Sequence, residues 1–155
     1  MKSQYVNRQL GYVDFVFSEI DKQSLDPFIE CLLAQYLAAL ICGIYEDAIE
    51  HLFDEYVGKE TKSTELKNYI AITVDQKFRN PNEAAVKGIL NLFNPQWSDQ
   101  LDSRLQRVNW EALNTLYTNK NKIAHGTECK ITYPQIKQNY QDSKKVIEEI
   151  DSLIL

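Results

Sequence analysis

The chain has 155 residues, of which 44% are hydrophobic and 25% are charged, and this composition excludes a disordered protein. Five glycines and four prolines leave little room for the frequent turns of a β-sandwich or β-barrel, so the composition favours long helices. The formal net charge of −5 excludes a uniformly basic nucleic-acid-binding protein but allows a local basic patch.

The length predicts one domain, spanning residues 1–155. We expect no membrane association, because no long uninterrupted apolar stretch is present and the N-terminal segment lacks the apolar core of a signal peptide. The three cysteines, Cys31, Cys42 and Cys129, form no CxxC pair. They are expected to be reduced thiols in a cytoplasmic protein, with Cys31 and Cys42 buried as small apolar side chains.

Two long apolar patterns open the chain. Residues 4–22 repeat apolar side chains mostly at three- and four-residue steps, which predicts one helix. A second, longer helix is predicted from Phe28 to a stop at Gly58. Its first half is apolar nearly all round and is expected to be central, whereas its acidic second half is expected to reach solvent.

The further helices follow from capping signals. A third helix begins after Ser63 or Thr64, and the fourth has Asn80 as its N-cap and ends before Pro95. A short polar helix is predicted over 97–108. Asn109 is expected to cap the helix over 110–125, and a Thr132–Gln135 capping box opens the last one. The predicted fold is an all-α, single-domain helical bundle of about six helices.

The sequence holds two histidines, His51 and His125, which are too far apart to form a zinc site without other ligands. His51 follows an acidic run, and we interpret it as a helix-surface or structural residue. Residues 118–145 contain six lysines and only two acidic residues, which suggests a phosphate partner there. The alternative is a chance distribution of helix-surface lysines.

Within this basic zone, Asn121 and His125 are four residues apart and share one helix face. His125 precedes Gly126, where a left-handed helix cap is expected, and a helix C-terminus favours a protonated imidazole. Lys120 lies one residue further back, at an expected exposed position. A cation, a carboxamide and a histidine at one helix end can hold a phosphodiester and move a proton. The alternative is that His125 is only a helix-terminal residue.

The segment Lys120-Asn121-Lys122-Ile123-Ala124-His125-Gly126 resembles the RNxxAHG signature of HEPN domains. Glu46 on the long helix, the segment from Asn82 to Phe93 and the helix after the motif are similar to features of RiboL-PSP-type and related prokaryotic HEPN groups. The resemblance implies an RNA-directed helical domain that pairs as a homodimer. Many such domains are metal-independent endoribonucleases of toxin or defence systems and need no cofactor, whereas others only bind RNA or act as scaffolds.

Carried over by position, His125 is the acid/base residue, Asn121 is the polar residue beside it, and Lys120 takes the arginine's place. Lysine keeps the charge but lacks the two-pronged guanidinium fork. Two functions therefore stay open: a homodimeric endoribonuclease, and a degenerate module that binds RNA or a partner protein such as an antitoxin. Lys122 is a supporting candidate.

Glu46 is a second supporting candidate, because it either pairs with Lys120, orients His125, or is an exposed member of the acidic run. The homodimer interface is predicted to include the motif helix, residues 110–125. One motif supplies one histidine, whereas RNA cleavage has two proton-transfer roles.

Overall fold

A computed structural model describes residues 1–78, 80–127 and 130–155. Within these ranges it contains seven helices and no strand, which confirms the all-α prediction. The helices are α1 (Gln4–Ile20), α2 (Pro27–Glu60), α3 (Thr64–Lys77), α4 (Glu83–Phe93), α5 (Pro95–Arg104), α6 (Arg107–Ala124) and α7 (Tyr133–Ile154). The expectation for Cys129 lies outside the described residues.

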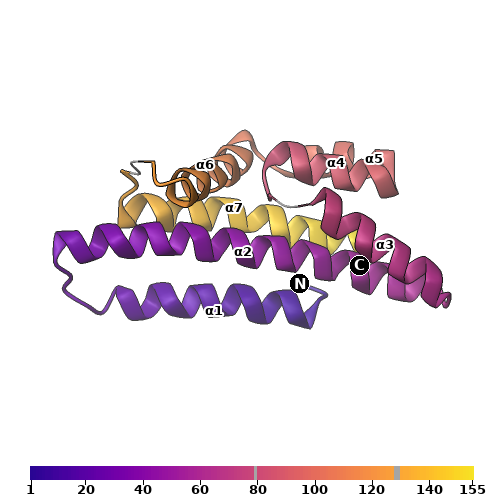
Figure 1. Cartoon of the computed structure of the whole chain (residues 1–155), viewed down its shortest axis with the longest axis horizontal. Helices are drawn as coiled ribbons and strands as arrows, with labels where there is room; N and C mark the ends of the chain where they lie inside the picture. The colour runs from indigo at the N-terminus through magenta and orange to yellow at the C-terminus, as the bar shows by residue number, and fades with distance from the viewer. Residues whose placement is uncertain (79, 128–129) are drawn as a thin grey trace.

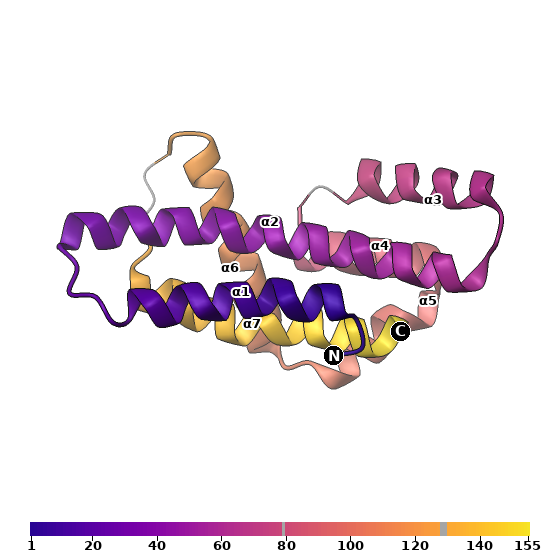
Figure 2. The same ribbon diagram turned by 90° about the horizontal axis from the view of Figure 1, so that it is seen from below.

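Helices α1, α2 and α7 run lengthwise along the molecule (Figure 1). Helix α6 crosses α2 and α7 instead of following them, and its C-terminal end extends beyond α2 (Figure 2). Helix α2 packs against α1, α3, α6 and α7, and α6 packs against both α7 and α2. Helix α6 is therefore held between two helices, α2 and α7, that are far apart in the chain.

The core gathers around the second half of α2, where Tyr45, Leu52 and Phe53 are fully buried. The first half instead leaves four large apolar side chains exposed: Phe28, Ile29, Leu32 and Tyr36. The expectation of a central first half is therefore wrong, whereas the second half reaches solvent through Asp47 and Asp54, as expected. Apolar periodicity identifies the helix, but burial depends on which part of its length other helices cover.

Helix α2 also has the length and composition of a membrane-spanning helix, with a mean hydropathy of 1.8 over its most apolar 18 residues. The central helix of a helical bundle meets the same two criteria. Because four other helices pack on α2, we interpret it as that central helix.

Three helix boundaries differ from the predictions. Helix α2 continues two residues past Gly58, and α6 begins at Arg107 with Gln106 as its N-cap. Asn109 acts three residues into that helix, where its side chain accepts a hydrogen bond from the Gln106 backbone N–H. The N-cap of α4 is Asn82, whose side chain accepts a hydrogen bond from Ala85 N–H. The prediction that Asn80 is this N-cap is wrong. The Asn80 side chain instead accepts a hydrogen bond from Lys120 of α6.

Other predicted caps are present as expected. The Ser63 side chain accepts a hydrogen bond from Leu66 N–H at the start of α3. Thr132 and Gln135 form a reciprocal capping box at the start of α7. This box fixes the residue at which α7 begins.

Candidate functional site

The motif lies at the C-terminal end of α6, which is closed by a left-handed glycine. Gly126 has φ +65°, as the sequence predicted, and its N–H donates to the Ile123 carbonyl over 3.1 Å. The Thr127 N–H donates to the Lys122 carbonyl over 2.8 Å, so the last turn is closed by two hydrogen bonds. His125 is the C-cap residue, and its side chain is exposed.

Asn121 precedes His125 by one helical turn, and its carbonyl accepts the His125 N–H over 3.0 Å. The Asn121 side chain is half-buried. Positions four residues apart share a helix face, so the carboxamide and the imidazole are neighbours at the helix end. Both groups are placed where an incoming phosphodiester can meet a hydrogen-bond donor and a proton carrier together.

Lys120 lies in the same part of α6, and its side chain points toward α2. Its Nζ lies 3.4 Å from Glu46 Oε1 and 3.2 Å from Asn80 Oδ1. The Lys120 side chain is only 26% exposed, so the expectation of an exposed helix-surface lysine is wrong. The contact with Asn80 is also the reason that this residue does not cap α4.

Burial shapes the electrostatics beside Lys120. Removal from water raises the pKa of Glu46, and the positive charge of Lys120 opposes that rise. Burial also raises the pKa of Cys42 to about 12, with the nearby Glu46 charge adding to the effect. A thiol that stays protonated at neutral pH is not a nucleophile, so Cys42 is a core residue, as predicted.

The other candidates occupy separate positions. Among the described residues, Glu46 contacts Lys120 and makes no contact with His125. The Lys122 side chain is exposed on a different face of α6 from that of Lys120. His51 stacks on Tyr5 with ring centroids 4.0 Å apart, and its Nε2 lies 3.1 Å from Glu55 Oε1. These contacts fit the structural role that the sequence predicted for His51.

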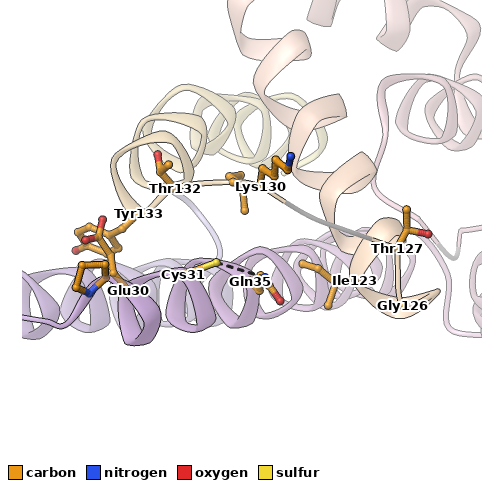
Figure 3. Close-up of a pocket in the computed structure, with 11 residues that line it drawn as sticks. Glu30, Cys31, Gln35, Ile123, Gly126, Thr127, Lys130, Thr132 and Tyr133 are labelled. Atoms are coloured by element: carbon orange, nitrogen blue, oxygen red, sulfur yellow. Dashed lines mark hydrogen bonds between the residues drawn. The ribbon is translucent and has the colours of Figure 1, made fainter.

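Sequence reasoning missed a cavity of about 720 Å³ beside the end of α6. It lies between the start of α2, the end of α6 and the start of α7 (Figure 3). Its lining includes Ile123 and Thr127 from the motif end, Gln35 and Cys31 from α2, and Tyr133 from α7. Cys31 is half-buried there instead of fully buried as expected, and its Sγ accepts a hydrogen bond from Gln35 Nε2 over 3.6 Å.

The start of α2 is far in sequence from the parts of α6 and α7 that complete this cavity, so no local pattern could reveal it. In the described part of the chain, no group of three His, Cys, Asp or Glu side chains is arranged to hold a metal ion. The described side chains of the motif at the end of α6 provide an imidazole, a carboxamide and lysines.

An all-α bundle that presents an Asn–His pair at the end of a crossing helix has the features of a HEPN domain. A family model described as RiboL-PSP-HEPN matches residues 12–155, so the chain belongs to this family, which is associated with nuclease or RNA-related functions. The match confirms the resemblance seen in the sequence. No curated protein and no solved structure matches the chain.

Replacing Gly126 with alanine should destabilise the protein by about 1–2 kcal/mol, because a Cβ is disfavoured at φ +65°. Gly11 provides the matched control. It lies inside α1 with open space where a Cβ would stand, so Gly11→Ala should stabilise by about 0.5–1 kcal/mol. Urea unfolding monitored by circular dichroism measures both changes. A Gly126→Ala protein as stable as the parent would contradict the left-handed cap.

Proposed function

We propose that the protein is a metal-independent endoribonuclease that acts on RNA as a homodimer. The observation that carries this proposal is the exposed His125 at the end of α6, with Asn121 one turn before it and Lys120 held beside the same turn. We extend the proposal to a cytoplasmic toxin or defence role, with an antitoxin as a further protein partner. Family membership supports an RNA-related function in general.

In the proposed reaction, the 2′-hydroxyl of RNA attacks the adjacent phosphorus. A bond forms between O2′ and phosphorus, and the bond from phosphorus to O5′ breaks. His125 of one protomer takes the O2′ proton, and the second histidine of the dimer gives a proton to O5′. Lys120 stabilises the extra negative charge on the phosphoryl oxygens. The products are a 2′,3′-cyclic phosphate and a 5′-hydroxyl end.

An exposed apolar stripe supports the homodimer. Phe28, Ile29, Leu32 and Tyr36 lie on the first half of α2, and Phe28 is 68% exposed. The same part of α2 borders the cavity at the end of α6. Contiguous exposed apolar surface favours association, and an interface here would bring two motif ends toward each other. The exposed surface of α6 is mostly polar, so α2 would supply most of the apolar contact.

The degenerate binding module remains the second candidate, and one observation favours it. Lys120 stands in the arginine's place, and its ammonium group already donates hydrogen bonds to Glu46 and Asn80. A lysine engaged in this way offers less charge to a phosphate than a free guanidinium does. Under this alternative, the motif binds RNA or a partner protein without cleaving RNA.

Cleavage of RNA by the purified protein in EDTA tests the main proposal. We expect cleavage to persist in EDTA and to leave 2′,3′-cyclic phosphate ends. His125→Ala should reduce the rate by about 10²–10⁴-fold, which is the usual contribution of a general acid or base. His51→Ala is the control, because it removes the other histidine without touching α6. Equal activity of the His125→Ala and parent proteins would contradict the proposal.

Lys120→Ala should reduce cleavage by about ten- to a thousand-fold, the scale of losing one transition-state charge contact, whereas Lys120→Arg should preserve or raise it. Lys144→Ala is a matched control. Lys144 of α7 is 25% exposed and pairs with Asp14 of α1 over 2.6 Å. Both alanine variants break an ion pair of a largely buried lysine, so only the loss of activity should differ. Cleavage that is indifferent to Lys120→Ala would put the catalytic cation elsewhere.

The dimer proposal predicts that Leu32→Asp converts a dimer into a monomer at micromolar concentration, because a carboxylate cannot be buried there without a partner. Light scattering coupled to size-exclusion chromatography measures the mass. Leu66→Asp on α3 is the control, since Leu66 and Leu32 are 46% and 47% exposed. A parent protein that is monomeric would contradict the proposal, and dissociation by Leu66→Asp alone would move the interface to α3.

A further inference from the structure

We infer that a groove between α6 and α7 binds the single-stranded RNA segment next to the cleaved linkage. The inference rests on the proposed function and adds a path for the substrate. The groove encloses about 410 Å³. Its lining includes Thr115, Asn119 and Lys122 from α6, Lys130 from the connection, and Gln135 and Asn139 from α7. We call it the α6–α7 groove.

The chemistry of this lining matches a nucleic-acid backbone. Lysines, hydroxyls and carboxamides are the side chains that most often contact phosphate and sugar oxygens. No aspartate or glutamate lines the groove among the described residues, although the chain carries a net charge of −5. The Lys122 side chain has no ion pair within the part of the chain that the structure describes. Its charge can therefore meet a phosphate without the loss of an existing ion pair.

The groove leads to the motif. Thr115, Asn119 and Lys122 follow one another at steps of four and three residues, so they form a stripe along α6. His125 is three residues beyond Lys122 and continues that stripe to the end of the helix. A strand that lies in the groove is thus directed toward the proposed catalytic residue.

The start of α7 adds a second attraction for phosphate. Gln135 lies in the first turn of this 22-residue helix and lines the groove. The N-terminus of a helix carries a partial positive charge and favours anions nearby. Lys122 and this helix end therefore place positive potential along one short path.

A protein partner fits the groove less well. Protein interfaces depend on aromatic and apolar side chains at their centre. The groove presents no large exposed apolar side chain among the described residues, and its Ile131 is only 6% exposed. Duplex RNA also fits less well, because proteins bind it across its wide, shallow minor groove and the neighbouring phosphates, a larger surface than a groove of about 410 Å³.

The test measures the affinity of a fluorescent single-stranded RNA oligonucleotide by anisotropy, in a full-length His125→Ala background that prevents cleavage. Thr115→Glu and Asn139→Glu each place a carboxylate in the groove. Gln141→Glu is the control, because Gln141 is exposed on α7 outside the groove and the added charge is the same. We expect the two groove variants to bind about tenfold more weakly or worse, and Gln141→Glu to stay within about twofold of the parent.

Lys122→Gln is an independent variant at an exposed site. It should lower the slope of log affinity against log salt by about one, as expected for the loss of one phosphate contact. Circular dichroism checks that each variant is folded. If a glutamate variant is unfolded, the salt dependence of Lys122→Gln tests the groove in its place. Equal affinities of Gln141→Glu and the groove variants, or duplex RNA bound as tightly as the single strand, would overturn the inference.

The two proposals can fail separately. If the parent protein cleaves RNA and His125→Ala does not, yet the groove variants bind RNA as tightly as Gln141→Glu, the ribonuclease stands and the groove is wrong. If the parent never cleaves but the groove variants lose RNA binding, the groove stands on a module that only binds RNA. A parent protein that binds no RNA overturns both.

Discussion

Between Ala38 and Val57, α2 buries ten side chains, and helices from both ends of the chain pack against this segment. The Tyr45 hydroxyl lies 3.0 Å from Ser143 Oγ in α7, and its burial raises the pKa of Tyr45. Helix α6 packs on both α2 and α7. The contact between α2 and α7 therefore also sets the position of α6. The position of the exposed His125 thus depends on packing far from its own side chain.

The sequence predicted the helices and several caps because those signals are local. Ser63, Thr132 and Gln135 act within one helical turn, so their roles can be deduced from residue type and spacing. Asn80 and Asn82 are both of a residue type that often caps helices, but Asn82 caps α4 and Asn80 contacts Lys120. The exposure of Leu32 and Tyr36 was unpredictable for a related reason, since periodicity does not indicate which apolar residues find a partner.

In the candidate site too, some features follow from local spacing and others depend on contacts between distant segments. Asn121, His125 and Gly126 lie within six residues, and the glycine cap and shared helix face follow from spacing. The proximity of Glu46 to Lys120 links positions 74 residues apart, so the sequence offered it only as one of three alternatives. The α6–α7 groove joins residues of two helices across a connection, and no single helical pattern contains it.

Helix α6 separates two electrostatic environments. On the α2 side, burial together with Asp75, Asp47, Glu46 and Asp54 raises the pKa of Glu50, which shows that negative charges are crowded there. On the α7 side, Lys122 and Lys130 line a groove without carboxylates among the described residues. Charges within about 8–10 Å interact even at physiological salt. Under the proposed function, a phosphate at the end of α6 would meet the lysines of the α7 side, whereas the carboxylates of the α2 side would oppose it. An acidic protein can bind a polyanion in this way because the two kinds of charge lie on opposite sides of one helix.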